Sequence, residues 1–371
     1  MSAGVVIAGA GLAAQRCAEA LRRGGYEGRL ILVGDERWAP YDRPPLSKEL
    51  LAGELEPGAA LLRPAGWHAE HEIELLLGDA ACGIDAPHRR LRLRGGDELP
   101  YEHLVIATGS RPRRLPGAEQ FANAGVLRTL DDAIALRADL KPGTRLTVLG
   151  AGLIGQEVAA TASARGARVT LIEAQPLPLA RALHPELARW LIGRQRSFGV
   201  DVRLGTALAS LHGDGDVLHR IALADGAQLE TDCLLVAIGV APNEEWLGAP
   251  LHELVRRPEI HAAGDVAGGD HWERAAWDGR AAAAAILGRP AAPAPATGWW
   301  SDIHGVRLQG LGDPAGADAL EIEGDQAAAS FTAVAWRAGR AAAALAVGRP
   351  RDFRRLRALI HNQSPSLEEA A

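Results

Sequence analysis

Two short glycine-rich segments of this sequence have the residue types and spacing that bind the pyrophosphate of a dinucleotide. In GAGLIG, Gly150, Gly152 and Gly155 form a complete GxGxxG pattern. The first glycine permits a tight turn, the second lets the backbone approach a pyrophosphate, and the third lets a helix pack against a strand. The segment GAGLAA near the N-terminus is the GxGxxA variant of this pattern. Its three positions are Gly9, Gly11 and Ala14.

An acidic residue follows each glycine pattern, at the end of the next apolar run. Asp35 comes after LILVG, and Glu173 comes after VTLI. A carboxylate at this place accepts hydrogen bonds from the ribose hydroxyls of a bound dinucleotide. One GxGxxG alone is weak evidence, but here a strand, a glycine turn, a helix and an acidic residue occur twice in the same order. The sequence therefore predicts two dinucleotide sites.

The segment YDRPPLSKEL adds two cations on either side of a proline pair. Pro44 and Pro45 fix φ, so we expect extended backbone that holds Arg43 and Lys48 at defined points. Two cations held in this way suit an anionic or polarisable ligand. The alternative is a proline-rich turn with two solvated charges.

The elements that must position these residues are two strand–turn–helix units, one at the N-terminus and one in the middle of the chain. Three further strands end in small residues: YEHLVIATGSRPRRLPG, TDCLLVAIGVAPN and EIHAAGDVAGG. In the last of them Asp265 follows Gly264, where a carboxylate and backbone amides could meet a polyol chain, although each segment could also be an ordinary strand exit. Two dinucleotide sites in one chain suggest hydride transfer from a nicotinamide to a flavin.

Length, charge and cysteine content exclude several classes of protein. A chain of 371 residues is long enough for two or three domains, and a net charge of -6 argues against a nucleic-acid partner. The apolar runs are too short to cross a bilayer and the N-terminus lacks the basic flank of a signal peptide, so we expect a cytoplasmic protein with no membrane partner. The three cysteines are far apart and form no CxxC, which indicates neither a disulfide framework nor a metal site.

The chain resembles the FAD-dependent NADH:ferredoxin reductases that serve bacterial aromatic-ring dioxygenases and cytochromes P450, the putidaredoxin reductase type. The resemblance rests on the order of GAGLAA, YDRPPLSK, ATGSRPR, RTLDDA, GAGLIGQE, IEAQ, AIGVAPN, AAGDVA and WWSD. It implies an α/β fold of glutathione-reductase type, with two Rossmann-type dinucleotide-binding domains and a C-terminal α+β domain. The implied limits are 1–112 and 238–296 for an FAD domain in two parts, 113–237 for an NADH domain, and 297–371 for the C-terminal domain.

The resemblance also implies roles for residues toward FAD. Lys48 would lie near the reactive edge of the isoalloxazine, where its ammonium could stabilise negative charge on the reduced ring. Asp35 would accept from the AMP ribose, and Trp272 would lie beside the flavin ring. The other FAD contacts implied are Gly9, Gly11, Ala13, Ala14, Arg43, Ala81, Arg128 and Asp265, and Gly239 is a further implied cofactor contact. Arg128 could equally be a surface partner of the helix that follows it.

Further roles concern the nicotinamide nucleotide and the C-terminal domain. Glu173 would bind the adenosine ribose, while Glu157 would lie where the nicotinamide arrives, although a plain helix residue is the alternative. Trp299 and Trp300 are adjacent, so in a strand they point to opposite faces. Only one of the two rings can lie in the core, and the resemblance implies that Trp300 lies near the flavin. The alternative is that one ring packs in the core and the other forms a surface patch.

Two alanine-rich segments test local propensity against the resemblance. GRAAAALAVGRPRDF has the composition of a helix, but the family implies a strand there, and we expect the strand. GRAAAAAILGRP, residues 279–290, is expected to be a true helix that ends at Gly288. The chain departs from the family at Ile303 and Asp278, where glutamine is usual.

The predicted function is hydride transfer from NADH to FAD, followed by transfer of single electrons to a [2Fe-2S] ferredoxin. The cofactors carry the chemistry and the protein orients them. One alternative is a disulfide reductase or peroxidase of the same fold, which would need a redox cysteine near the flavin. The other is a flavin-binding interaction or redox-sensor protein of the apoptosis-inducing-factor kind, whose reduced complex with NAD persists.

Overall fold

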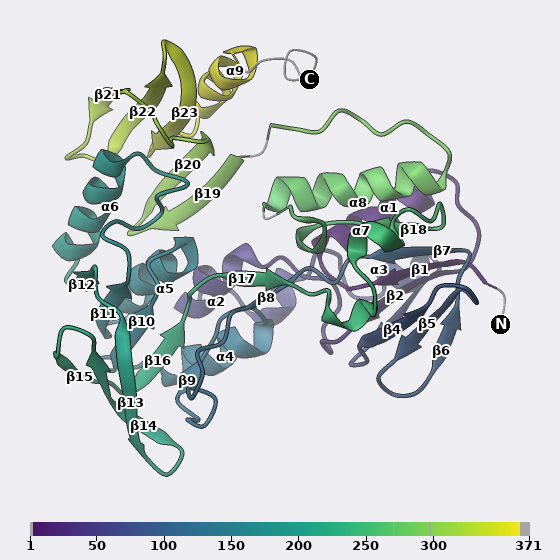
Figure 1. The fold of residues 1–371 in the computed structure, drawn as a ribbon, viewed down its shortest axis with the longest axis horizontal. Coiled ribbons are helices and arrows are strands. Elements are labelled where there is room, and N and C mark those ends of the chain that lie inside the picture. Colours follow the sequence, from purple (N-terminus) through teal and green to yellow (C-terminus); the bar gives the residue numbers. More distant parts are fainter. Residues whose placement is uncertain (1–2, 270, 297, 364–371) are drawn as a thin grey trace. The chain divides into compact units, whose positions relative to one another are not determined.

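The computed structural model describes residues 3–269, 271–296 and 298–363, which form two compact units (Figure 1). Of the described residues, unit 1 comprises 3–43, 57–111, 240–269 and 271–295, and unit 2 comprises 44–56, 112–239, 296 and 298–363. A separate pair of short strands is formed by β8 (Ser110–Pro112) and β17 (Val240–Pro242). The domain limits given above remain predictions.

Unit 1 is built on a five-stranded parallel sheet with the order β18-β7-β1-β2-β3. Its strands are β1 (Val5–Ala8), β2 (Leu30–Gly34), β3 (Ile73–Leu77), β7 (His103–Ile106) and β18 (Ile260–Ala262). β1 and β2 are buried along their whole length, as expected for continuous apolar runs in a parallel sheet. The glycine turn therefore follows a central strand.

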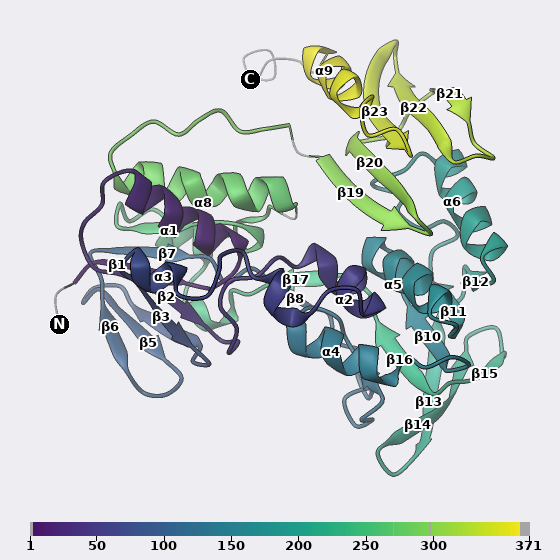
Figure 2. The same cartoon turned by 180° about the vertical axis from the view of Figure 1, so that it is seen from behind.

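Helices α1 (Leu12–Arg23) and α8 (Trp272–Ile286) lie side by side on one face of this sheet, as Figures 1 and 2 both show. They approach closely because Gly279 has no side chain: a Cβ there would lie 2.2 Å from the carbonyl oxygen of Ala13. A helix is confirmed within the predicted range 279–290, but α8 begins earlier, at Trp272, and ends at Ile286, shortly before Gly288 at φ +65°. The other face packs against the antiparallel strands β4 (Ala81–Asp85), β5 (Arg90–Leu93) and β6 (Glu98–Pro100).

Unit 2 contains a second parallel sheet with the order β12-β11-β10-β16-β9. Its strands are β9 (Ala124–Gly125), β10 (Arg145–Leu149), β11 (Arg168–Glu173), β12 (Asp201–Leu204) and β16 (Cys233–Val236). The helices of this part are α2 (Glu49–Ala52), α4 (Leu130–Asp139), α5 (Leu153–Ala164) and α6 (Pro185–Ser197). An antiparallel sheet follows, made of β13 (Leu208–Asp214), β14 (Val217–Leu223) and β15 (Gln228–Glu230). Two strand–turn–helix units are thus present, as predicted.

The C-terminal part of unit 2 is an antiparallel sheet with the order β19-β20-β23-β22-β21 and one helix, α9 (Phe353–Gln363). The strands are β19 (Gly298–Ile303), β20 (Val306–Gly312), β21 (Ala319–Asp325), β22 (Ser330–Arg337) and β23 (Arg340–Val347). β23 confirms the expected strand, because its alanines are buried against β22 and α9 and tertiary packing outweighs their helix propensity. In β19, Trp299 is buried and Trp300 is half-buried, as alternation requires.

The short elements correct one expectation. The proline pair lies in a 3-10 helix, Pro44–Ser47, and not in extended backbone. The physical reason is that the φ fixed by a proline ring also suits a 3-10 helix.

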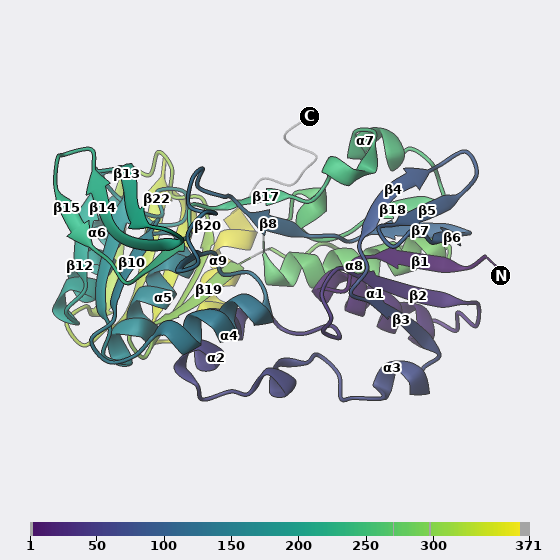
Figure 3. The same ribbon diagram turned by 90° about the horizontal axis from the view of Figure 1, so that it is seen from below.

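Figure 3 shows the short helices α3 (Trp67–Glu70) and α7 (Leu251–Leu254). The other short turns are 3-10 helices at Pro57–Ala60, Glu245–Leu247 and Asp265–Ala267. Within the described ranges, no helix is both long and apolar enough to cross a membrane.

Candidate functional site

The glycine turn of unit 1 joins β1 to α1 and has the geometry that its pattern predicts. Gly9 has φ +129°, and a Cβ there would lie 2.1 Å from the carbonyl oxygen of Ala107, so only glycine fits. Gly11 has φ -95°, and a Cβ there would meet no protein atom within 4 Å. Ala13 and Ala14 are buried in the core below the turn. The backbone of Gly11 therefore faces open space at a helix N-terminus, as binding of a pyrophosphate requires.

Two other predicted contacts lie beside this turn. Asp35 directly follows β2, and a Cβ at the preceding Gly34 would lie 2.8 Å from the Cβ of Ala10 in the turn. Asp35 is exposed and pairs with Arg94 at 3.0 Å. Ala81 begins β4 two residues after Asp79, whose backbone N–H donates to the carbonyl of Gly34 over 3.1 Å. The end of β2 thus brings Asp35 and the start of β4 close to the turn.

Asp265 lies on the other side of the same turn. Gly264, at φ +80°, is so close to Ala13 that a Cβ would lie 3.1 Å from the alanine Cβ. Ser110 donates its hydroxyl to Oδ2 of Asp265 over 2.6 Å. The backbone N–H of Gly264 donates to Asp278 over 3.2 Å. Asp278 is buried and held by Arg274 at 2.7 Å, so it fixes the loop that carries Asp265.

Arg43 and Trp272 both contact the segment that precedes the proline pair. Arg43 donates to Oε1 of Glu36 over 2.8 Å and to the hydroxyl of Tyr41 over 3.0 Å. Trp272 donates its indole N–H to Asp42 over 2.7 Å. Arg43 is therefore held at a defined point, and the alternative of a solvated charge is wrong for this residue.

The glycine turn of unit 2 joins β10 to α5 and repeats the geometry of the first. At Gly150, φ is +103° and a Cβ would lie 2.4 Å from the carbonyl oxygen of Ala237. At Gly155 it would lie 2.0 Å from the oxygen of Gly150, whereas at Gly152 it would meet nothing within 4 Å. Glu173 ends β11, and its two carboxylate oxygens accept from the backbone N–H groups of Ala151, over 3.0 Å, and Gln175, over 2.9 Å. The acidic residue therefore touches the turn itself.

The structure brings Lys48 and Glu157 together inside unit 2. The Lys48 ammonium lies 2.9 Å from Oε1 of Glu157, and both side chains are at most 10% exposed. Ser301 donates its hydroxyl to Oε1 of Glu157 over 2.6 Å, and Ser47 donates to Oε2. Lys48 also donates to the carbonyl of Pro44 over 3.1 Å. Glu157 is thus more than a plain helix residue, because it holds a buried ammonium and two buried hydroxyls.

Sequence reasoning gave no role to Ser47, Ser301, Glu36 or Ser110, which all take part in these arrangements. Ser47 and Ser301 lie inside YDRPPLSK and WWSD, the segments that carried the resemblance, so the motifs contained a signal that residue type alone did not reveal. Two predicted cofactor contacts, Gly239 and Arg128, lie outside these groups. Gly239 follows β16 at φ +95°, and the backbone N–H of Arg128 donates to Asp132 before α4 over 2.9 Å. Both assignments stay predictions.

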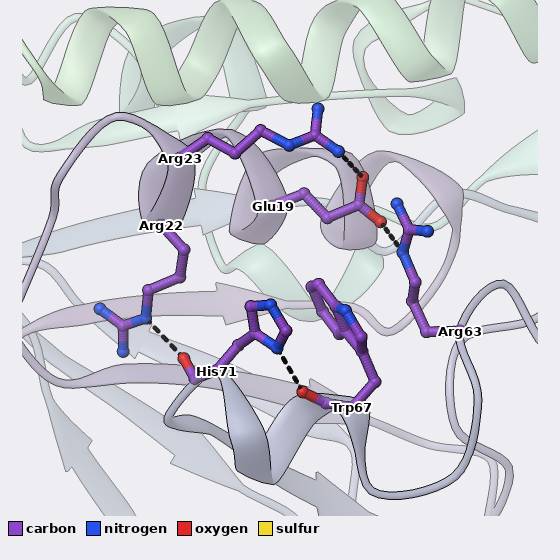
Figure 4. Close-up of a pocket in the computed structure, with 6 residues that line it drawn as sticks. All are labelled: Glu19, Arg22, Arg23, Arg63, Trp67 and His71. Atoms are coloured by element: carbon purple, nitrogen blue, oxygen red, sulfur yellow. Dashed lines mark hydrogen bonds and ion pairs between the residues drawn. The ribbon is translucent and has the colours of Figure 1, made fainter.

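Unit 1 has one more feature, a cavity of about 300 Å³ at the end of α1 (Figure 4). It is lined by Glu19, Arg22, Arg23, Arg63, Trp67 and His71. Arg22 donates to four backbone carbonyls, those of Tyr26, Gly28, His71 and Glu72. Burial alone would raise the pKa of Glu19, but hydrogen bonds from Arg63, Gln15 and Arg16 lower that pKa to about 2. These cations already have partners within the unit, so they fasten the segment around α3 to α1.

Within residues 3–269, 271–296 and 298–363 no group of three or more histidine, cysteine or acidic side chains is arranged to hold a metal ion. Gly11 and Gly152 point to ligands because each is the second glycine of its pattern and a Cβ there would meet no protein atom within 4 Å. Each faces space that the backbone of the turn leaves free at the N-terminus of a 12-residue helix. The residues present at both turns therefore fit a bound dinucleotide.

The chain is similar in sequence and in structure to known oxidoreductases. The sequence model of the pyridine nucleotide-disulphide oxidoreductase family matches residues 3–279. A second family model, described as reductase C-terminal, matches residues 299–371. The ferredoxin reductase component of chlorobenzene dioxygenase from Cupriavidus sp. (strain PS12) is 36% identical over 95% of this chain and 91% of its own. Putidaredoxin reductase from Pseudomonas putida is 33% identical over 97% and 92%.

A solved structure, that of the covalent putidaredoxin reductase–putidaredoxin complex, is similar with a TM-score of 0.91 at 30% identity. The similarity covers 100% of this chain and 95% of the solved one. These comparisons confirm the predicted fold class, and they agree with the family resemblance that the sequence motifs carried.

Proposed function

Because the chain belongs to the pyridine nucleotide-disulphide oxidoreductase family, and within it to the ferredoxin reductases, we propose that it passes electrons from NADH through FAD to a [2Fe-2S] ferredoxin that serves an oxygenase. The observation that carries the proposal is the pair of glycine turns, each with an open second glycine and an acidic residue at the end of the next strand. When bound, FAD supplies the chemistry of this reaction, since it takes two electrons at once from a nicotinamide and releases them singly.

The protein's own part in this reaction is binding, orientation and charge placement. In unit 1 the turn around Gly11, with Asp35 and Asp265 beside it, would hold FAD. In unit 2 the turn around Gly152 and the Glu173 carboxylate would hold NADH. We assign Lys48 and Glu157 to the reduction step: the Lys48 ammonium, held by Glu157, would stabilise negative charge on a bound flavin. We place the reaction in the cytoplasm, where NADH is supplied.

The cysteines disfavour the disulfide reductase alternative. Cys17 and Cys233 are buried, and burial raises the pKa of each thiol to about 12. A redox thiol needs thiolate character and access, which neither residue has. Cys82 is exposed on β4, far in sequence from both. A ferredoxin reductase needs no such thiol.

The function is tested by adding NADH to the purified protein in the presence and absence of a [2Fe-2S] ferredoxin, with cytochrome c as the final acceptor. We expect a yellow protein with FAD that NADH bleaches and that reduces cytochrome c only with ferredoxin. A colourless protein that takes up no FAD would contradict the proposal. A reduced complex that persists in the presence of every ferredoxin tested would instead favour the redox-sensor alternative.

We expect NADH to be preferred over NADPH by about 100-fold or more in kcat/KM, because the Glu173 carboxylate repels a 2'-phosphate. Arg165 does not relieve this repulsion, since its guanidinium donates to the carbonyls of Ala52, Arg137 and Leu140. In a Glu173→Ala variant the preference should shrink by about tenfold. Measurement of kcat/KM with both nucleotides checks this, and an unchanged preference in the variant would remove Glu173 from its role.

We propose that the ferredoxin docks on cations of the C-terminal part, which include Arg307, Arg337, Arg351, Arg354, Arg355 and Arg357. Phe353, Leu356 and Ile360 of α9 are buried, whereas Arg354 is exposed. Ferredoxins are typically acidic, so an attraction of this kind speeds encounter and weakens with salt.

Charge reversal by Arg354→Glu with Arg357→Glu should raise the KM for ferredoxin several-fold and leave reduction by NADH unchanged. Arg357 also lies over the ring of Phe353 at 5.2 Å, so Arg354→Glu alone separates charge from packing. Arg220→Glu, on an exposed position of β14, is the control variant. An unchanged KM that does not respond to ionic strength would place the docking surface elsewhere.

A further inference from the structure

The carboxylate of Glu157 is held by more donors than an ion pair requires. The residue is buried in α5, and its oxygens accept from the Lys48 ammonium and from two hydroxyls, those of Ser47 and Ser301. Both serines are themselves buried, at 5% and 0% exposure. A hydroxyl has one proton to donate, and in both serines that proton is directed to Glu157. Each carboxylate oxygen therefore has a fixed hydroxyl donor.

These donors come from chain segments that are far apart in the sequence. Ser47 ends the 3-10 helix Pro44–Ser47, and Ser301 lies in β19, where it pairs with Leu308 of β20. The backbone of Ser47 is fixed as well, because Thr161, one helical turn after Glu157, donates its hydroxyl to the Ser47 carbonyl over 2.8 Å. Ser47 is thus held to α5 by both its side chain and its backbone.

Burying a charged pair costs free energy unless its remaining hydrogen-bonding capacity is satisfied. Without the serines, Glu157 would keep a single ammonium donor and could rotate about its side-chain torsions. Lys48 uses one proton on Glu157 and one on the carbonyl of Pro44, so the direction of its third N–H depends on where Glu157 is held.

We propose that Ser47 and Ser301 are positioning residues that clamp the Glu157 carboxylate and thereby orient Lys48 for the reaction with NADH. The clamp is a feature of unit 2, and its role in NADH oxidation rests on the proposed function. Ser301 gives the C-terminal sheet a part in the reduction step that is separate from ferredoxin docking. Neither serine transfers a proton or an electron.

The test is a double-mutant cycle with Ser301→Ala and Glu157→Gln in the FAD-bound protein. Stopped-flow reduction by NADH gives the limiting rate and the Kd separately. We expect Ser301→Ala to lower the limiting rate about tenfold with little change in Kd, because orientation is lost and affinity is not. In the Glu157→Gln background the same substitution should change the rate by less than about twofold, since the two residues act as a unit.

Three further measurements keep the result unambiguous. Ser47→Ala is an independent second variant, for use if Ser301→Ala folds poorly. Thr147→Val is the matched control: it removes a buried hydroxyl of the same unit, bonded to Thr231 over 3.0 Å, and should leave the limiting rate unchanged. Urea midpoints of all variants are compared as a readout that needs no catalysis.

The clamp is overturned if both serine variants reduce at the wild-type rate, or if their effects add to that of Glu157→Gln. Non-additive rates together with non-additive urea midpoints support it. If NADH does not reduce the protein at all, the proposed function fails, and the clamp is then judged on the urea midpoints alone. Additive midpoints in that case overturn the clamp as well.

Discussion

A Gly11→Val variant is expected to fold normally and to purify without FAD. Gly11 has φ -95° and ψ -166°, a conformation that valine adopts readily, and a Cβ there meets no protein atom within 4 Å. The new side chain would fill the space that the turn leaves open for a pyrophosphate. Each backbone N–H contact to a charged phosphate is worth roughly 1.5–3 kcal/mol, so the loss of two would weaken binding by at least about 100-fold.

The measurement is the ratio of FAD to protein after purification and after incubation with excess FAD, together with circular dichroism of the apoprotein. Gly9→Val is the contrasting variant. Its Cβ would lie 2.1 Å from the carbonyl oxygen of Ala107 and it would force φ +129° on valine, so we expect loss of structure as well as loss of FAD. Stoichiometric FAD in Gly11→Val would show that this turn does not bind the flavin nucleotide.

The glycine turns could be predicted from sequence because their pattern is local: a strand, a tight turn and a helix N-terminus lie within a dozen residues. The contact that excludes a Cβ at Gly155 is with the oxygen of Gly150 in the same turn, whereas the carbonyls of Ala107 and Ala237, which exclude a Cβ at Gly9 and Gly150, come from distant parts of the chain. The alternation of Trp299 and Trp300 is local in the same sense. For β23 local reasoning alone would have predicted a helix, and only the resemblance supplied the strand, because its stability comes from packing against β22 and α9.

The hydroxyl clamp on Glu157 could not be predicted in this way. It joins positions 47, 157 and 301, and no spacing rule links a serine in a 3-10 turn to one in an antiparallel strand. The buried network of Glu19 is similar, since Gln15 and Arg63 meet it from a helix and a loop 44 residues away. Serine in particular is most often a surface or turn residue, so the residue type alone does not predict a buried hydrogen bond to a carboxylate.

A Gly152→Val variant should show the opposite behaviour to Gly11→Val: a yellow protein, with FAD bound, that NADH no longer reduces. Gly152 has φ -67° and ψ -178°, and a Cβ there also meets nothing within 4 Å, so valine should fit the fold. It would occupy the space in front of the N-terminus of α5, where the phosphates of NADH are proposed to bind. We expect kcat/KM for NADH to fall by about 100-fold or more.

The FAD content and the reduction by dithionite should remain those of the wild-type protein. Gly193→Val is the matched control, because Gly193 is also exposed and open but lies in α6, away from either turn in the sequence. It should leave NADH reduction unchanged. The two valine variants together assign one dinucleotide to each turn. Gly11→Val is expected to abolish binding of FAD, and Gly152→Val is expected to abolish binding of NADH while FAD stays bound. A Gly152→Val protein that lost FAD, or that NADH still reduced at the wild-type rate, would show that the assignment of NADH to unit 2 is wrong.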